Sequence, residues 1–159
     1  FLIEVFEQIH QRRPDSVLLL AGQGETMDEI RQLVSQKGLD DAVKFLGIRK
    51  DIAHLMNAMD VFVLPSFFEG LPVVGVEAQC TGLPVVTSTL VAHELPIESL
   101  ALYLSLDDSP ATWAQKILEE AARPRADTRD EIIASGYEVK EAARKLEMIY
   151  LNAGKESQK

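Results

Sequence analysis

The sequence predicts an α/β fold in which helices cover both faces of a doubly wound parallel sheet. Short apolar runs alternate with amphipathic segments along the chain, the runs are rich in β-branched residues, and glycines stand at the turns between them. Because this alternation is typical of parallel sheets with helices on both faces, we expect one domain over residues 1–151. Residues 152–159 are polar, and we expect them to form a frayed tail.

The boundaries of the elements follow from hydrophobic periodicity and from turn residues. Short apolar runs predict five strands, at 17–21, 43–47, 61–64, 83–87 and 102–106. Amphipathic segments predict six helices, at 1–11, 27–36, 52–59, 73–81, 110–122 and 139–151. Pro72 suits the first helical position, and Gly82 is a usual C-terminal stop. Ser109 is expected to cap the helix that Pro110 opens.

The composition is that of a globular domain and excludes several classes of function. Of the 159 residues, 25 are acidic and 16 are basic, which gives a formal charge of −9. Because binding to nucleic-acid phosphates needs clustered Lys and Arg, this charge argues against a nucleic-acid partner and against this domain as a membrane-binding surface. The single cysteine, Cys80, excludes an intrachain disulfide and a cysteine-rich metal site. Its small neighbours predict a packed thiol.

Two carboxylates with seven residues between them, Glu69 and Glu77, are the strongest functional signal. Glu69 stands in the turn after the strand at 61–64, and Glu77 stands on the next helix. In an open α/β sheet, anionic ligands bind at the start of such a helix, where free N–H groups face the carboxyl edge of the strands. Helical side chains lean toward the N-terminus, so the Glu77 carboxylate can accept from both hydroxyls of a ribose. Glu69 lies nearer the other end of a bound diphosphate, where a donor sugar would stand.

The order of several motifs resembles the group 1 (family 4) retaining glycosyltransferases, whose GT-B fold has two Rossmann-like domains. The matching stretches are Leu-Leu-Leu-Ala-Gly-Gln-Gly (18–24), Val-Lys-Phe-Leu-Gly (43–47), Ala-Met-Asp-Val-Phe-Val-Leu-Pro-Ser (58–66) and the block from Glu69 to Glu77. Further stretches, at 88–90, 104–110 and 145–150, are similar to the bacterial branch that makes exopolysaccharide or capsular polysaccharide. The resemblance covers nearly the whole chain. It implies a Rossmann-like doubly wound parallel sheet that is the C-terminal, nucleotide-sugar-binding half of a GT-B enzyme.

The resemblance implies a role for each glutamate and for the turn between them. The family's glutamate at the position of Glu77 contacts the nucleotide ribose, and the one at Glu69 is catalytic, contacting the donor sugar near the reacting centre. Backbone amides of the turn hold the diphosphate. Pro72 has no N–H, so the donor-binding amides must belong to its neighbours, Gly70, Leu71, Val73 and Val74.

Four residues that follow two other strands are candidate contacts to the nucleobase or a phosphate, namely Gly22, Gly47, Ile48 and Arg49. Arg49 could instead be solvated or pair with Asp51 at a helix start. The stretch 22–24 is also similar to a dinucleotide-binding loop. Met27 stands where the third glycine of that pattern belongs, so a nicotinamide or flavin site is disfavoured.

The resemblance also implies parts that this chain does not contain. Family members carry, before the position of Phe1, a strand and loop with an Arg and a Lys that bind the donor diphosphate, and an N-terminal acceptor-binding domain. The absent strand would lie between the strands at 17–21 and 61–64. The sheet must therefore show a gap there, close it by direct pairing, or borrow a strand from another copy. We expect this piece alone to be inactive.

The implied function is transfer of a hexose or related sugar from a UDP-sugar, or in second place a GDP-sugar, to a polysaccharide or lipid-linked acceptor. The resemblance implies a cytoplasmic enzyme with no metal and no cofactor, whose peripheral membrane contact would be made through the missing domain. Two alternatives stay open. A non-catalytic Rossmann-like nucleotide-binding or regulatory module would keep the fold without needing paired glutamates. A sugar-phosphate isomerase or UDP-sugar epimerase would share the nucleotide but not the block from 60 to 87.

Overall fold

The computed structural model describes residues 1–156, with side chains described as far as residue 152. Within these residues lie five strands: β1 Leu18–Ala21, β2 Val43–Gly47, β3 Phe62–Leu64, β4 Val85–Ser88 and β5 Ala101–Leu104. The helices are α1 Leu2–Arg12, α2 Met27–Gln36, α3 Ile52–Ala58, α4 Val73–Cys80, α5 Pro110–Ala121, α6 Arg129–Ala134 and α7 Val139–Glu156, with a 3₁₀ turn at Glu98–Leu100. Every predicted strand and helix is present, and apart from the end of α7 their boundaries lie within two residues of the prediction.

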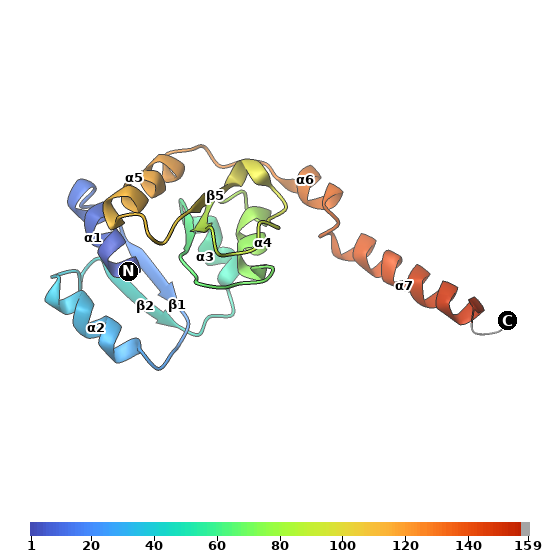
Figure 1. Cartoon of the computed structure of the whole chain (residues 1–159), viewed down its shortest axis with the longest axis horizontal. Helices are drawn as coiled ribbons and strands as arrows, with labels where there is room; N and C mark the ends of the chain where they lie inside the picture. The colour runs from blue at the N-terminus through green and yellow to red at the C-terminus, as the bar shows by residue number, and fades with distance from the viewer. Residues whose placement is uncertain (157–159) are drawn as a thin grey trace.

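All strand pairs are parallel, as predicted, but they form two sheets (Figure 1). β1 pairs with β2, and the second sheet has the order β3-β4-β5. β1 and β3 are not hydrogen-bonded to each other. Of the three arrangements expected for the sheet between 17–21 and 61–64, the structure therefore has the gap.

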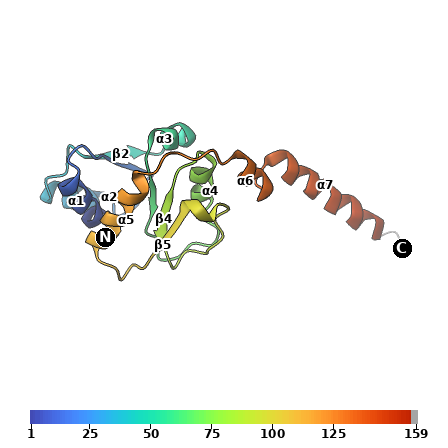
Figure 2. The same cartoon turned by 90° about the horizontal axis from the view of Figure 1, so that it is seen from above.

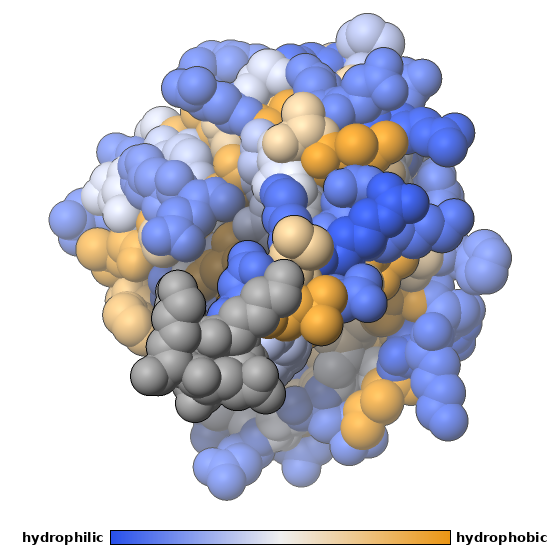
Figure 3. Space-filling model, turned by 90° about the vertical axis from the view of Figure 1, so that its right-hand side faces the viewer, coloured by the Kyte–Doolittle hydropathy of each residue, from blue (hydrophilic) through white to orange (hydrophobic). Residues whose placement is uncertain are grey.

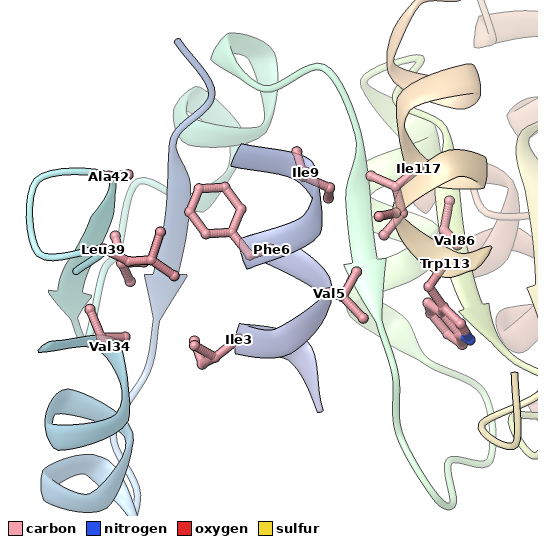
Figure 4. Packing of buried hydrophobic residues seen from close by; sticks show 12 residues of the cluster. Ile3, Val5, Phe6, Ile9, Val34, Leu39, Ala42, Val86, Trp113 and Ile117 are labelled. Atoms are coloured by element: carbon pink, nitrogen blue, oxygen red, sulfur yellow. The ribbon is translucent and has the colours of Figure 1, made fainter. Parts of the chain in front are cut away.

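Helix α1 packs against both sheets and joins them into one hydrophobic core (Figure 4). Its buried side chains are Ile3, Val5, Phe6 and Ile9. The same cluster contains partly buried side chains from β1 and from the β3 region, namely Leu18, Leu20, Val61 and Val63. Figure 4 shows Phe6 directed toward Leu39 and Val5 directed to the opposite side. Burial of apolar surface on α1 thus stabilises the two sheets together across the gap.

A second cluster holds α4 against the second sheet. Val76 and Ala78 of α4 pack with Leu83 and Val85, and Met56 of α3 closes the cluster. Glu77 lies between the two buried α4 residues in sequence but is exposed. The helix therefore buries one face and presents the carboxylate from the other.

Two elements after β4 were not predicted, the 3₁₀ turn and α6. Ile132 is the buried residue of α6, and a single buried side chain in so short a helix gives no periodicity to detect. Helix α7 was predicted to end at about 151, but it continues to Glu156. An existing helix adds one hydrogen bond for each further residue, so continuation through polar residues is inexpensive. Residues 157–159 lie outside the described part of the chain.

Helix α7 projects away from the rest of the molecule (Figures 1 and 2). Its apolar side chains Leu146, Ile149 and Tyr150 are exposed. Seen from the side on which α7 projects, the surface is mostly hydrophilic, with separate apolar patches (Figure 3). None of the helices in residues 1–156 combines the length and apolar content that crossing a bilayer requires.

Candidate functional site

The turn that carries Glu69 joins the carboxyl end of β3 to the start of α4. The Glu69 side chain is half-buried, and Ser66 Oγ donates to Glu69 Oε1 at 3.4 Å. The backbone of Glu69 forms an isolated parallel bridge with Val91. Beside this bridge, the Ala92 N–H donates to the Glu69 carbonyl oxygen at 3.2 Å. The loops that follow the adjacent strands β3 and β4 therefore meet at Glu69.

Backbone N–H groups at this turn are free to bind an anion. Within residues 1–156, no hydrogen bond is made by the N–H groups of Gly70, Leu71, Val73 and Val74. The N–H groups of Gly75 and Val76 both donate to the Pro72 carbonyl, at 2.8 and 3.2 Å, and no side chain caps the helix. Unpaired N–H groups and the helix dipole both favour negative charge at this end. Each of the four residues predicted to hold a diphosphate thus has a backbone donor without a partner in the described part of the chain.

Glu77 lies one turn into α4 on its exposed face. The helix rises about 6 Å over the four residues from Val73 to Glu77, and helical side chains lean back toward the N-terminus, which favours a carboxylate directed toward the helix start. The opposite face is anchored by Gln79, which is fully buried. Gln79 Nε2 donates to the Ile97 carbonyl at 2.8 Å, and the Ile97 N–H donates to Gln79 Oε1 at 2.9 Å. Thr128 Oγ1 also donates to the Gln79 carbonyl at 2.8 Å. These bonds fix the rotation of α4 about its axis and with it the direction of Glu77.

Cys80 is exposed, which corrects the prediction of a packed thiol. The buried residues of α4 are Gly75, Val76, Ala78 and Gln79, so the buried face centres on Gly75 and Gln79, and position 80 falls beyond its edge on the side of Glu77. Although the residue is exposed, neighbouring atoms partly desolvate its thiol; this desolvation raises the pKa of the Cys80 thiol, and the negative charge of Glu77 raises it further. Because the thiolate is the nucleophilic form, a raised pKa makes Cys80 a poor nucleophile at neutral pH.

The other candidate contacts lie at the ends of β1 and β2, in the first sheet. Gly22 and Gly47 have φ values of +133° and +62°, and the Gly22 N–H donates to the Gly47 carbonyl at 2.8 Å. Ile48 is exposed. Arg49 donates twice to Asp51, from Nε at 2.8 Å and from Nη2 at 2.6 Å. These hydrogen bonds lower the pKa of Asp51. Arg49 therefore makes the ion pair named above as its alternative role, and its contact to a nucleotide stays a prediction.

Two hollows in the described surface lie away from the glutamates. One is beside β2 and is lined in part by Arg31 and Phe45, and the other is at the C-terminal end of α4 beside Cys80 and Arg125. Neither hollow is lined by Glu69 or Glu77. Among the side chains that the structure describes, at residues 1–152, no three of His, Cys, Asp or Glu gather into a group able to hold a metal ion.

Sequence reasoning missed the side chains that fasten the Glu69 turn. Ser88, the last residue of β4, is fully buried. Its Oγ donates to the Ser66 carbonyl and accepts from the Leu90 N–H at 3.2 Å. Its position at the end of a predicted strand could have indicated this role. The carboxyl ends of adjacent parallel strands meet at one edge of a sheet, so a polar residue there can reach the turn after the next strand.

Comparison with known proteins identifies the family. Residues 1–122 match the family described as glycosyl transferases group 1. EpsF of Bacillus subtilis (strain 168), which is named as a glycosyltransferase, is 36% identical over 154 residues, or 94% of this chain and 40% of EpsF. An Escherichia coli alpha-1,3-galactosyltransferase, named for UDP-Gal and alpha-D-GlcNAc-diphosphoundecaprenol, is 42% identical over 78 residues, or 48% of this chain and 20% of that protein. The chain thus spans less than half the length of these relatives.

Solved structures share the fold. A TarM variant from S. aureus, crystallised with Fondaparinux, alpha-GlcNAc-glycerol and UDP, superposes with a TM-score of 0.76 at 23% identity, covering 95% of this chain and 31% of TarM. HepE of Anabaena, crystallised with UDP and glucose, superposes with a TM-score of 0.61 at 25% identity, covering 84% of this chain and 37% of HepE. The fold is the Rossmann-like parallel α/β fold of GT-B glycosyltransferases, as the sequence predicted. With its family match over residues 1–122, the chain belongs to the group 1 glycosyl transferases.

Proposed function

We propose that this chain is the donor-binding half of a retaining glycosyltransferase that moves a sugar from a UDP-sugar to a polysaccharide or lipid-linked acceptor. The observation that carries the proposal is the arrangement around the start of α4. Glu69 stands in the turn before the helix, unpaired N–H groups follow it, and Glu77 lies one turn into the helix. This order corresponds to the three parts of a nucleotide-sugar, which are the sugar, the diphosphate and the ribose.

Each part of the donor meets a group with suitable chemistry. The two oxygens of the Glu77 carboxylate accept from the two hydroxyls of the ribose, in charge-assisted hydrogen bonds. The N–H groups of Gly70, Leu71, Val73 and Val74 donate to the diphosphate, whose charge the helix dipole also favours. Glu69 accepts from hydroxyls of the donor sugar.

In the reaction, the bond between the anomeric carbon and the diphosphate oxygen breaks. The acceptor hydroxyl oxygen bonds to the same face of that carbon, and its proton passes to the departing diphosphate oxygen. Glu69 positions the donor sugar and stabilises the positive charge that develops at the anomeric carbon. The free N–H groups at α4 stabilise the departing diphosphate. No side chain is assigned as a covalent nucleophile, and no metal or other cofactor is assigned.

The donor and the acceptor are proposed from the relatives. The E. coli relative is named for UDP-Gal and a diphosphoundecaprenol acceptor, and HepE was crystallised with UDP and glucose. A UDP-sugar is therefore proposed ahead of a GDP-sugar. Because the chain covers 40% of EpsF, the proposed enzyme is a longer protein, in which a second domain binds the acceptor. We place it in the cytoplasm, with its membrane contact through that second domain.

Calorimetric titration of the full-length protein with UDP, GDP and their sugars tests the proposal. UDP and at least one UDP-sugar should bind, and GDP should bind more weakly. A protein that binds none of these nucleotides would contradict the proposal and favour a regulatory module that keeps only the fold.

A further inference from the structure

We propose that Ser88 is a positioning residue that holds Glu69 where it can contact the donor sugar. The inference rests on the proposed function, because it concerns how the sugar-contacting carboxylate is kept in place. Ser88 itself does not touch the donor, since its side chain is fully buried.

Two hydrogen bonds that both involve Ser66 lead from Ser88 to the Glu69 carboxylate. Ser88 Oγ donates to the carbonyl of Ser66, and the hydroxyl of Ser66 donates to Glu69 Oε1 at 3.4 Å. Ser88 Oγ also accepts from the Leu90 N–H at 3.2 Å. One buried hydroxyl therefore ties the loop after β3, which carries Glu69, to the loop after β4.

The second loop supports Glu69 from its other side. Val91 forms the parallel bridge with Glu69, and the Ala92 N–H donates to the Glu69 carbonyl at 3.2 Å. Ser88 fixes the start of this loop through Leu90, so it acts on both segments that reach Glu69. Glu69 is therefore held through its side chain by Ser66 and through its backbone by Val91 and Ala92, and Ser88 is bonded to both of these segments.

The neighbouring residue Thr87 provides a matched comparison. Thr87 is fully buried like Ser88, and its Oγ1 donates to the Leu64 carbonyl at 2.9 Å. Both hydroxyls thus bond from β4 to a backbone carbonyl of the neighbouring segment. Leu64 lies within β3, whereas Ser66 lies in the turn with Glu69. Loss of either bond should destabilise the fold similarly, but only loss of the Ser88 bond should weaken binding of the donor sugar.

The test measures how much more tightly the full-length protein binds a UDP-sugar than UDP. The probes are UDP and whichever of UDP-glucose, UDP-galactose and UDP-N-acetylglucosamine binds more tightly than UDP to the parent protein. The variants are Ser88→Ala, Thr87→Val and, as the reference for the proposed function, Glu69→Ala. Urea unfolding of each variant reports the structural cost separately.

Ser88→Ala should lower the ratio of UDP-sugar affinity to UDP affinity by about 10-fold, because small displacements of a positioning group are costly. Its affinity for free UDP should be unchanged. Thr87→Val should leave the ratio within about two-fold of the parent, a change worth about 0.4 kcal/mol, because the lost bond ends inside β3 and not in the turn that carries Glu69. If Ser88→Ala fails to fold, Ser66→Ala removes the bond from Ser66 to Glu69 and should lower the ratio.

The contrary outcomes are distinct. The role of Ser88 is overturned if Glu69→Ala removes the extra affinity for the UDP-sugar but Ser88→Ala leaves the affinity ratio unchanged. It is also overturned if Thr87→Val lowers the affinity ratio as much as Ser88→Ala does. An unchanged ratio in Ser66→Ala overturns it as well if Ser88→Ala does not fold. An unchanged ratio in Glu69→Ala overturns the proposed sugar contact itself, and the role of Ser88 with it.

Discussion

Gly82 lies so close to Ala126 that a Cβ added to Gly82 would stand 2.1 Å from the Ala126 carbonyl oxygen. Gly82 ends α4 with a φ of +73°, and its carbonyl accepts from the Ala126 N–H at 3.4 Å. Beside this contact, Arg125 Nη1 donates to the Thr81 carbonyl at 2.6 Å, and Nη2 donates to the Met56 carbonyl at 3.1 Å. The segment after α5 therefore holds the C-terminal ends of both α3 and α4.

Replacement of this glycine should destabilise the fold. Gly82→Ala should lower the free energy of unfolding by at least about 2 kcal/mol, because a non-glycine residue is strained at this φ and its Cβ overlaps a backbone oxygen. The measurement is urea unfolding of the parent and the variant.

Gly24→Ala is the matched control, because a Cβ at Gly24 meets nothing within 4 Å and its φ is not in the left-handed region. It should change the free energy of unfolding by no more than about 0.5 kcal/mol. Equal losses in the two variants would show that the contact with Ala126 does not control stability.

The pKa of the Cys80 thiol should depend on the charge of Glu77. Because burial and Glu77 both raise its pKa, the thiol should become reactive toward a disulfide reagent only at a higher pH than a free cysteine. Glu77→Gln removes the negative charge and should move the pH profile of the reaction to lower pH. The measurement is the rate of thiol modification between about pH 7 and pH 10, around the ordinary cysteine pKa.

The control for this experiment is Glu29→Gln, an exposed carboxylate on α2. It should leave the Cys80 profile unchanged. A profile that does not move in Glu77→Gln would mean that the carboxylate is directed away from the thiol, and the orientation of Glu77 would have to be revised.

Much of this arrangement could be predicted from residues close together in sequence. The strands are short apolar runs, and the turn with Gly70 and Pro72 predicted that α4 would begin at about Val73, which the structure confirms, although Pro72 is the N-cap residue and not the first helical residue. Ser109 was expected to cap α5, and its Oγ does accept from the Thr112 N–H at 3.1 Å. These features depend on local patterns of polarity and backbone conformation.

The features that were missed depend on contacts between distant residues. The bonds of Gln79 to Ile97 and of Ser88 to Ser66 join different loops, and no local pattern marks them. The exposure of Cys80 follows from the rotation of α4, which those contacts fix. The gap between the sheets was predicted only as one of three outcomes. A strand order states which strands are neighbours, but it does not state how the sheet responds when the strand between two of them is absent.

Glu77→Ala should weaken UDP binding to the full-length protein by about 1.5–3 kcal/mol, the usual cost of losing a charged hydrogen bond. Stability should barely change, since Glu77 is exposed. Calorimetric titration of UDP into both proteins is the measurement. Glu29→Ala should bind UDP like the parent, and a Glu77→Ala variant that does the same would remove Glu77 from the site.

The 159-residue chain alone should show no sugar transfer, whereas the full-length protein should be active. The chain covers 40% of its relative EpsF, and in the proposed enzyme closure of a second domain over the donor completes the site. The assay is transfer of a radiolabelled sugar to a lipid-linked acceptor. Turnover by the 159-residue chain near the full-length rate would contradict the two-domain proposal.

The central claim is that Glu77 binds the nucleotide while Glu69 binds the sugar, and it is tested most directly by titrating UDP and a UDP-sugar into Glu69→Ala. In the full-length protein this variant should bind free UDP like the parent and lose the extra affinity for the UDP-sugar. Turnover should fall more than donor affinity, because the contact stabilises the reacting centre. If Glu69→Ala instead weakens free UDP as much as Glu77→Ala does, the assignment of the two glutamates to different parts of the donor is wrong.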